Sequence, residues 1–300
     1  MDDLDTKPWL GTDRDAVFRG LLAAYGTAVE LRASGSAFVV APEAASCGAP
    51  AERLDDRHSL SVFGYVDGEP GRWGRSLMRT GLNEVVEMLA KLHSHPATTP
   101  GVARRWFAIP GRAELDSAMA DLDVVWDGGP LSEAARRDLT THTRLIERWL
   151  AHLDRFTARL SERGNATVLT HGEPHPGNLI LTKAGLVLVD WDSVALAPPE
   201  RDLWMFDGMG DAVFTHYQTL TGITPDRDAV SAYRLLWALA DAAAFVVQLR
   251  REPRDEPDAH KALDSLRSIF ERRAPSPYNV IGCPWSTQGC GGHQPMRRMA

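Results

Sequence analysis

The sequence predicts an α+β protein with two lobes: a small N-terminal lobe and a large, mainly helical lobe that contains an inserted β-hairpin. Three observations lead to this prediction. Short apolar runs typical of strands are concentrated before residue 70, and helical periodicity dominates after residue 82. A polar, proline-containing segment with a hairpin pattern interrupts the helices at residues 170–192.

In the small lobe, residues 13–33 have the periodicity of an amphipathic helix, which Thr12 or Asp13 can cap. The run "AFVVAP" at residues 37–42 is typical of a short buried strand that ends at a proline. Residues 59–70 alternate in polarity and then break at a glycine and a proline, which indicates a strand leading into a linker.

The large lobe is expected to be helical around one hairpin. The hairpin strands are "NLILT" and "LVLVD", joined by the turn "KAG". The expected helices are 82–93, 113–125, 131–162, 200–206, 212–220, 227–250 and 257–273. The predicted units are a partial small lobe at residues 1–68 with a hinge near 63–68, a helical lobe at 69–273, and an atypical or disordered tail at 274–300.

Charge and composition narrow the class of protein. The net charge of −7 with no block of lysine or arginine argues against a nucleic-acid partner. Three cysteines do not make a disulfide framework, so a reducing cytoplasm is expected. The acidic N-terminus does not resemble a signal peptide. The most apolar run, residues 235–249, is too short to span a bilayer and contains Asp241, which predicts a core helix and no membrane partner.

The tail from residue 274 changes in composition and has no periodicity. Cys283, Cys290 and His293 can in principle ligate zinc, but their spacing fits no common zinc finger and a fourth ligand is missing. A disordered tail is the preferred interpretation.

The segment at residues 170–192 concentrates the polar chemistry. Pro174, Pro176 and Gly177 exclude regular structure within residues 171–177, so we expect a fixed loop. The hairpin then brings Glu173, Asn178 and Asp190 around one point. The spacing of histidine, any residue, acid, four residues and asparagine matches the catalytic loop of protein kinases, in which the acid orients a hydroxyl and the asparagine holds Mg²⁺.

With "HGEPHPGN", "LVLVDWD" and "PPERDLW" the sequence resembles the aminoglycoside phosphotransferases, kinases of small molecules with a protein-kinase-like fold. The resemblance covers residues 12–273 in the order of elements and implies ATP and Mg²⁺ as cofactors. It implies that Glu173 is the catalytic acid, that Asn178 and Asp190 hold magnesium, and that Asp202 supports the loop.

The same resemblance implies a hinge that contacts adenine. The segment "SVFGYVDGE" would supply the contacting residues, which are Phe63, Gly64, Tyr65 and Val66.

The histidines and tryptophans of the loop region also have structural interpretations. His171 is a candidate catalytic residue, although a buried loop histidine more often satisfies backbone groups. His175 either shapes the loop or touches phosphate. Asp192 is a supporting acid or a cap, and Asp202 can also simply cap the following helix. The tryptophans are expected to be packing residues; they are Trp191 and Trp204.

Two features depart from the family pattern. Glu173 stands where the family has aspartate, and a misplacement of ~1 Å can lower a rate ~100-fold; either the loop shifts to compensate or the chemistry is weakened. The second departure is that only about a dozen residues precede the first helix, with Lys7 as their one lysine and Pro8 directly after it. We therefore expect a truncated small lobe without the strands and lysine that cover the phosphates, weak binding of ATP, partly uncovered apolar surface, and a sheet edge available for a dimer.

Three functions follow, in order of preference. The first is ATP-dependent phosphorylation of a hydroxyl on a small cationic molecule, such as an aminoglycoside or aminocyclitol. An acidic surface with Asp207, Asp211 and residues 252–256 would bind it. The second is a catalytically weak binding module with the kinase fold. The third is a metal-dependent hydrolase that uses His171, Glu173, His175 and Asp190, although the prolines between them spoil the required geometry.

Overall fold

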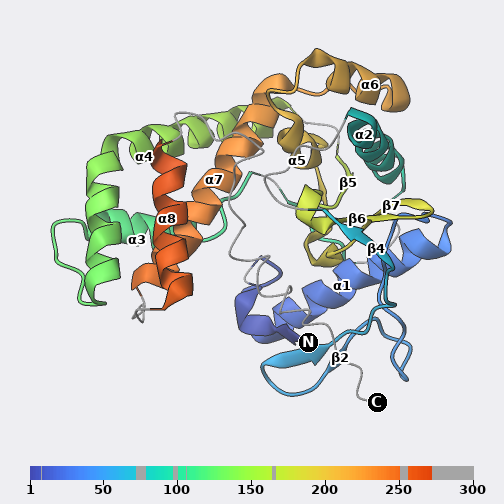
Figure 1. The fold of residues 1–300 in the computed structure, drawn as a ribbon, viewed down its shortest axis with the longest axis horizontal. Coiled ribbons are helices and arrows are strands. Elements are labelled where there is room, and N and C mark those ends of the chain that lie inside the picture. Colours follow the sequence, from blue (N-terminus) through green and yellow to red (C-terminus); the bar gives the residue numbers. More distant parts are fainter. Residues whose placement is uncertain are drawn as a thin grey trace.

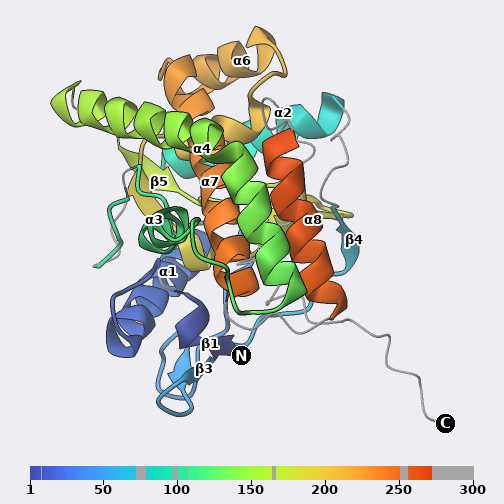
Figure 2. The same cartoon turned by 90° about the vertical axis from the view of Figure 1, so that its left-hand side faces the viewer.

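The computed structural model describes residues 1–7, 9–71, 79–96, 101–105, 107–163, 167–250 and 256–271. Two regions are evident in Figure 1. The helices α3 (Arg112–Ala120), α4 (Pro130–Arg163), α7 (Arg227–Arg250) and α8 (Pro257–Glu271) form one group, and α1 (Arg14–Ala33) lies with the short strands at the other side of the molecule. The rotated view in Figure 2 again shows α1, β1 and β3 together below the helices. The two-lobe arrangement predicted from the sequence is therefore present.

The small lobe is built on one helix and a three-stranded sheet. Helix α1 spans Arg14–Ala33, and Asp13 caps it by accepting a hydrogen bond of 2.8 Å from the backbone N–H of Ala16. The sheet has the order β1-β3-β2, with antiparallel pairing throughout. Its strands are β1 Asp2–Asp3, β2 Glu52–Arg53 and β3 His58–Leu60, and the 3₁₀ helix η1 Leu4–Thr6 follows β1.

The apolar face of α1 is covered, contrary to expectation. Leu21 is fully buried and Tyr25 is 4% exposed, and Leu10 packs against them in a small separate core. Residues before α1 and the small sheet thus cover the face that the sequence predicted to be bare. The expectation was wrong because a short segment without strand periodicity can still cover a helix when it folds back over it.

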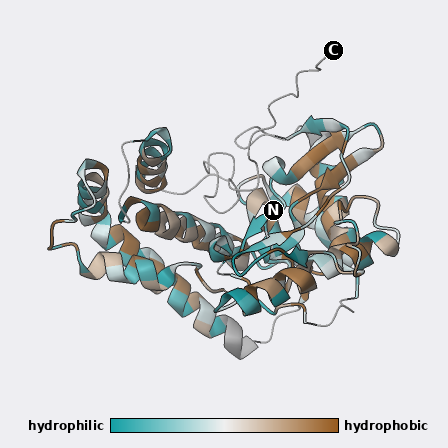
Figure 3. Ribbon diagram, turned by 90° about the horizontal axis from the view of Figure 1, so that it is seen from below, coloured by the Kyte–Doolittle hydropathy of each residue, from teal (hydrophilic) through white to brown (hydrophobic). Residues whose placement is uncertain are grey.

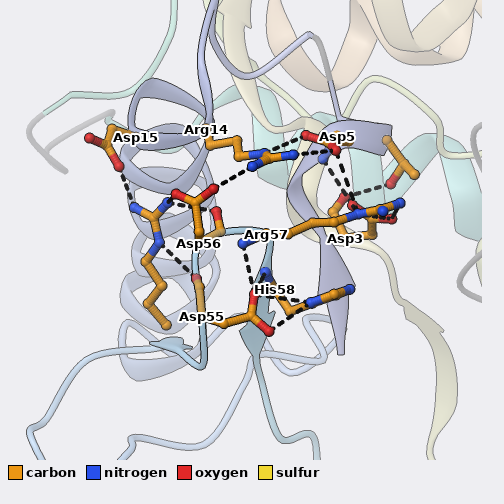
Figure 4. A network of polar contacts seen from close by, with 10 residues as sticks. Asp3, Asp5, Arg14, Asp15, Asp55, Asp56, Arg57 and His58 are labelled. Carbon is orange, nitrogen blue, oxygen red and sulfur yellow. Dashed lines mark hydrogen bonds and ion pairs between the residues drawn. The ribbon is translucent and has the colours of Figure 1, made fainter.

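Exposed ion pairs join the small sheet to α1, as Figure 4 shows. Arg14 forms a bidentate pair with Asp5, with distances of 2.7 and 2.8 Å, and Arg57 contacts Asp3 at 2.5 Å. Arg53 bonds to Asp15 on the helix. Exposed pairs contribute little individually, but a network of this kind fixes the orientation of its members.

The expected strand at residues 37–42 is reduced to isolated bridges. Val39 forms a parallel bridge with Leu188 in the large lobe, and Pro42 forms an antiparallel bridge with Phe63. Pro42 has no N–H to donate, and the next backbone bond of this pairing runs from the N–H of Glu43 to the carbonyl of Val62, at 2.7 Å. The consequence is a direct backbone link between the lobes, in which the N–H of Leu188 donates to Phe38 at 2.7 Å.

The expected linker after residue 67 is instead a strand. β4 Gly68–Pro70 pairs antiparallel with β6 Leu179–Thr182, which forms the predicted hairpin with β7 Gly185–Leu188. The chain therefore enters the large lobe as the third strand of the hairpin sheet. The proposed domain boundary at residue 68 falls at the start of this strand and stays a prediction.

The helices of the large lobe follow the predicted ranges closely. The ribbon coloured by hydropathy shows both apolar and polar residues along the helices (Figure 3). Their bounds are α2 Arg79–His93, α3 Arg112–Ala120, α4 Pro130–Arg163, α5 Glu200–Leu203, α6 Asp211–Thr221, α7 Arg227–Arg250 and α8 Pro257–Glu271, with the 3₁₀ helix η4 Trp204–Phe206 after α5.

Helix α7 is the central core helix. Its length and apolar composition would suffice for a membrane span, but 72% of its most apolar window is buried inside the protein. Asp241 is 2% exposed, and α7 packs against α3, α4 and α8. This burial matches the core role predicted from the sequence.

A short sheet that the sequence analysis missed supports the polar loop. β5 Val168–Thr170 pairs antiparallel with β8 Ala195–Ala197, which brings Thr170 opposite Ala195. The sequence "ALA" carries no alternation, so β8 gave no signal.

Candidate active site

Strand β5 leads into the loop at residues 171–177, and a single carboxylate fixes the backbone at the start of this loop. Asp202 on α5 accepts hydrogen bonds from the backbone N–H groups of His171, at 2.8 Å, and Gly172, at 2.6 Å. Its side chain is fully buried. Gly172 has φ +101°, a conformation that favours glycine, and a Cβ there would lie 2.3 Å from the Arg201 guanidinium. The supporting role predicted for Asp202 agrees with these contacts.

Two further buried side chains orient Asp202. The Nε2–H of His93, at the end of α2, donates to Asp202 at 3.1 Å. The hydroxyl of Tyr217, on α6, donates in turn to Nδ1 of His93 at 2.7 Å. Three helices thus converge on the loop through one chain of hydrogen bonds, and neither His93 nor Tyr217 was singled out from the sequence.

His171 uses both ring nitrogens within the protein. Nε2–H donates to the carbonyl of Val189 at 3.0 Å, and Nδ1 accepts from the backbone N–H of Glu173 at 3.2 Å. Burial lowers the pKa of His171 to about 4, so the ring is neutral at neutral pH. These are the contacts of a residue that shapes the loop, and its catalytic role stays a prediction without geometric support.

Glu173 is ionised in spite of its burial. Burial would raise its pKa, but the nearby imidazole of His175 outweighs that effect and lowers the pKa of the carboxyl. His175 Nε2 lies 3.7 Å from Glu173 Oε2. A carboxylate kept ionised at this position can accept a proton from a hydroxyl.

Asn178 ties the loop to the hairpin. Its Nδ2–H donates to the carbonyl of Glu173 at 3.0 Å, and its own backbone N–H donates to the carbonyl of His175 at 2.9 Å. Its backbone carbonyl accepts from Val189 at 2.9 Å, one residue before Asp190. Because the amide nitrogen is engaged, Oδ1 is the atom that Asn178 can offer to a metal.

Asp190 has a strained backbone and an acidic neighbourhood. It is the one non-glycine residue with positive φ, at 66°, in the part of the chain that the structure describes. Burial, together with the charges of Asp192 and Glu173, raises its pKa well above the usual value. A bound cation would offset the repulsion among these carboxylates. Backbone strain such as the positive φ of Asp190 is concentrated at functional sites.

Lys7 reaches this cluster from the N-terminal segment. Its ammonium group forms a buried ion pair with Asp192 and lies 3.2 Å from Asp2. Burial would lower the pKa of Lys7, but the carboxylates of Asp192 and Asp2 outweigh it and raise the pKa, so the ammonium stays charged. The N-terminal segment thus brings a lysine to this cluster without forming a strand; the expectation that residues 1–12 supply no lysine over the phosphates stays a prediction.

The hinge predicted to contact adenine is extended and accessible. Phe63 packs edge-on against Tyr25 at 5.6 Å between ring centroids, while Tyr65 is 86% exposed. Within the described part of the chain, residues 64–66 make no backbone–backbone hydrogen bond. The role of these residues in binding adenine stays a prediction.

Comparison with known proteins identifies the family of this arrangement. Residues 14–214 match the APH family, the phosphotransferase enzyme family. The matched range contains the loop, the hairpin, Asp190 and Asp202. The chain belongs to the APH phosphotransferase family. The family and the kinase-like fold predicted from the sequence are therefore confirmed.

Several relatives resemble this phosphotransferase over most of its length. StrN of Streptomyces griseus is 27% identical over 249 residues, which cover 79% of this chain and 72% of that protein. The structure of spectinomycin phosphotransferase APH(9)-Ia with ADP and spectinomycin has a TM-score of 0.67 at 17% identity, covering 86% of this chain and 80% of that one. The GDP and kanamycin complex of APH(2")-IIia has a TM-score of 0.54 at 14% identity, covering 85% and 84%. At these identities the two structural likenesses concern the fold.

Beside Glu173 the phosphotransferase has a cavity of about 190 Å³. The cavity is formed by the N-terminal segment, the segment before α3, the loop, α5 and α7. The residues that line it are Trp9, Arg104, Arg105, Ala108, Pro110, Glu173, Ser193, Arg201, Tyr233, Leu236 and Trp237. Most of these residues gave no signal in the sequence, because they come together only through the fold.

The acids predicted to bind a cationic acceptor do not line this cavity. Asp207 is paired with Arg234 at 3.0 Å, and Asp211 lies 3.6 Å from Arg227. Residues 251–255 lie outside the described residues, as do the cysteines and histidine of the tail. The tryptophans predicted to be packing residues are buried, with Trp191 0% and Trp204 3% exposed.

The site has no self-contained metal centre among the described residues. No group of three or more histidine, cysteine, aspartate or glutamate side chains in this part of the chain could hold a metal ion. Asn178 and Asp190 alone would leave most of a magnesium shell to water and phosphate, which is the usual way Mg²⁺ is held beside a nucleotide. The two residues therefore fit a nucleotide-associated magnesium ion and do not fit a hydrolytic metal site.

Proposed function

We propose that this chain transfers the γ-phosphoryl group of ATP to a hydroxyl group of a small, polyhydroxylated molecule. The observation that carries the proposal is the junction of loop and hairpin. Asn178 bonds to the Glu173 carbonyl at 3.0 Å, and the backbone contact with Val189 brings Asp190 beside it. A proton acceptor and two oxygen ligands are thereby held in one buried site.

The reaction follows from these positions. The acceptor oxygen attacks the γ-phosphorus while its proton passes to the carboxylate of Glu173. The bond between the γ-phosphorus and the β,γ-bridging oxygen breaks, and ADP leaves with the bonding electron pair. Asn178 and Asp190 would hold Mg²⁺, which when bound neutralises phosphate charge. Asp202 fixes the loop that carries Glu173, and positioning of this kind supplies much of the rate in phosphoryl transfer.

The nucleotide would lie between the hinge and the hairpin sheet. Unbonded backbone groups at residues 64–66 suit an adenine edge, because adenine presents both a donor and an acceptor. Lys7 would supply positive charge on the small-lobe side of the phosphates. Weak affinity for ATP, expected from the short N-terminal segment, stays a prediction, as does a cytoplasmic location.

The acceptor would be of the size of a sugar or aminocyclitol ring. Spectinomycin phosphotransferase and the kanamycin-binding relative support an acceptor of this class by their likeness in fold. The predicted acidic acceptor surface has less support, since Asp207 and Asp211 already have arginine partners.

Titration calorimetry of Mg·ATP into the whole chain tests the nucleotide half of the proposal. Saturable binding that requires magnesium is expected, together with release of ADP in the presence of a hydroxylated acceptor. Asp127→Asn, at an exposed position outside the site, is the control for a change of charge alone. Binding of ADP or ATP with no dependence on magnesium, and no transfer to any acceptor, would favour the alternative of a catalytically weak binding module.

A further inference from the structure

The cavity beside Glu173 carries more positive than negative charge. Three arginines line it, namely Arg104, Arg105 and Arg201, against the single carboxylate of Glu173. Among the described residues, neither Arg105 nor Arg201 has a carboxylate within salt-bridge distance. Asp192 acts on Arg105 only at longer range and is already paired with Lys7. The net charge of the lining is therefore positive.

Of the two inner arginines, Arg201 is buried and Arg105 is partly buried, and neither contacts a carboxylate directly. The charges of Glu173 and Asp202 act on Arg201 only at longer range. Arg201 is 6% exposed and bonds to neutral oxygens, the hydroxyl of Thr170 at 2.8 Å and the carbonyl of Ser193 at 2.9 Å. Arg105 donates to the carbonyl of Trp9. Burial and the nearby charge of Arg201 lower the pKa of Arg105 to about 10, so it is still charged at neutral pH. Buried charges without a counter-charge are costly and usually mark a place where one binds.

The polar groups of the cavity lining that have no hydrogen-bond partner are mainly donors, which matches the positive charge of the lining. Arg105 Nε, Trp237 Nε1 and the Tyr233 hydroxyl are buried and have no hydrogen-bond partner among the described residues. The first two of these can only donate. A lining rich in donors suits a ligand rich in acceptor oxygens, and a guanidinium group suits carboxylate or phosphate in particular.

We propose that the cavity binds the phosphoryl acceptor through an anionic group, so that the acceptor is a hydroxylated carboxylate or phosphate rather than a polycation. This inference rests on the proposed function, because it makes the cavity beside Glu173 the acceptor site. Arg104 and Arg105 bind the anionic group, while Arg201 supplies charge and holds β5 to the segment after Asp192. The aromatic side chains of Trp9, Tyr233 and Trp237 form walls that pack against the acceptor. The cavity volume is below the ~300–1,000 Å³ of sites that enclose drug-sized ligands, so the acceptor has a single ring.

Four matched sugars test the inference: glucuronate, glucose 6-phosphate, glucose and glucosamine. They share a hexose ring and differ in carrying a carboxylate, a phosphate, no charge or an ammonium group. Calorimetry on the whole chain should give at least ~10-fold tighter binding for one or both anions than for glucosamine. That preference should weaken as salt is raised. Whichever anion binds more tightly identifies carboxylate or phosphate as the recognised group.

Arg104→Gln and Arg105→Gln should each reduce the preference for the anion. Arg104 is exposed, so its replacement is not expected to disturb folding, whereas Arg105 is partly buried and its variant is checked by circular dichroism. Arg144→Gln, on the exposed face of α4, is the matched control and should leave all four affinities unchanged. A preference for glucosamine, equal affinities, no binding by any of the four sugars, or an anion preference unaffected by both arginine variants would overturn the inference.

A separate measurement distinguishes this inference from the proposed function. Binding of Mg·ATP and release of ADP are followed with each sugar. If ATP binds and only glucosamine is phosphorylated, the proposed function stands and the anionic acceptor is wrong. If the anion binds through Arg104 and Arg105 but Mg·ATP does not bind at all, the anion site stands and the proposed function is wrong.

Discussion

Lys7 and Asp192, 185 residues apart in the sequence, form a buried ion pair at the edge of the candidate active site. The pair joins the N-terminal segment to the turn that follows Asp190. Removing one partner of such a pair leaves an uncompensated charge in a poorly solvated place.

Lys7→Met is therefore expected to destabilise the protein by about 3–5 kcal/mol, measured by urea unfolding. Lys91→Met, at an exposed position on α2, should change stability little. In the double variant with Asp192→Asn, much of the loss should be recovered, because the buried Asp192 charge is removed together with its partner, while Asp2, which is also 3.2 Å from Lys7, is unchanged in both variants. Additive effects of the two substitutions would show that the pair contributes no coupling.

Asp190→Asn should weaken the binding of Mg·ATP while leaving magnesium-free ADP binding nearly unchanged. The substitution removes a hard anionic ligand and also relieves the repulsion that raises the pKa of Asp190. We expect a loss of affinity of ~10-fold or more, equivalent to about 1.4 kcal/mol. Titrations with and without magnesium measure it, and equal losses in both would argue against a role as metal ligand.

Glu173→Gln removes the proton acceptor and should lower kcat by ~10²–10⁴-fold with little change in nucleotide affinity. Glu173→Asp keeps the charge but draws the carboxylate back from the position it holds 3.7 Å from His175. A loss of ~10–100-fold is expected for the shorter acid. If Glu173→Asp were faster than the wild type, the loop would have the geometry of the shorter acid and glutamate would be the weaker base.

Gly172→Ala should destabilise the loop by about 3 kcal/mol or more, because backbone strain and a collision with the buried Arg201 guanidinium add. Gly208→Ala separates the two effects. Gly208 also has positive φ, at 85°, but a Cβ there would meet no described atom within 4 Å. A cost of ~1 kcal/mol from strain alone is expected for this control. Thermal unfolding of both variants compares them, and equal costs would mean that the contact with Arg201 is unimportant.

The buried His171 makes stability depend on pH. Its pKa is about 4 in the folded protein, below the ordinary value of 6.5. Between these values the unfolded chain binds the proton and the folded chain does not, so stability falls as the pH is lowered from 6.5 towards 4 and is unaffected above that window. The full effect is about 3 kcal/mol. Unfolding curves between pH 8 and 4 for the wild type and His171→Gln should diverge in slope in that window.

Local sequence patterns predicted the large lobe well. Helix α7 has the bounds inferred from its apolar run, and the hairpin follows from two short strands around a glycine turn. Glu173 and Asn178 were selected because their spacing matches the catalytic loop of protein kinases, and Asp190 was selected as the next acid at a strand end; their roles stay predictions. These features depend on neighbours in the chain, which a sequence displays directly.

The features that were missed depend on distant partners. Within residues 37–42, Val39 pairs with Leu188 of the large lobe and Pro42 pairs with Phe63, each as an isolated bridge. Lys7 has no strand pattern around it, and its partner Asp192 lies 185 residues further along the chain. The positive cavity brings together Arg105, Arg201 and Tyr233. None of these residues indicates a binding site when it is read alone in the sequence. Contacts between residues that are far apart in the sequence leave no trace in the local pattern of apolar and polar residues.

The hydrogen-bond chain from Tyr217 through His93 to Asp202 also constrains how the protein is made. Tyr217 and His93 are 124 residues apart, and Asp202 lies 31 residues after the loop that it holds. Synthesis proceeds from the N-terminus, and contacts between distant residues form only after both have emerged. When the loop with Glu173 leaves the ribosome, His93 has therefore been synthesised, but Asp202 and Tyr217, the other two side chains of the hydrogen-bond chain, have not. A nascent chain arrested before residue 217 can complete α1 and the small sheet, but its catalytic loop has no fixed geometry until α5 and α6 have been translated and have docked against α2.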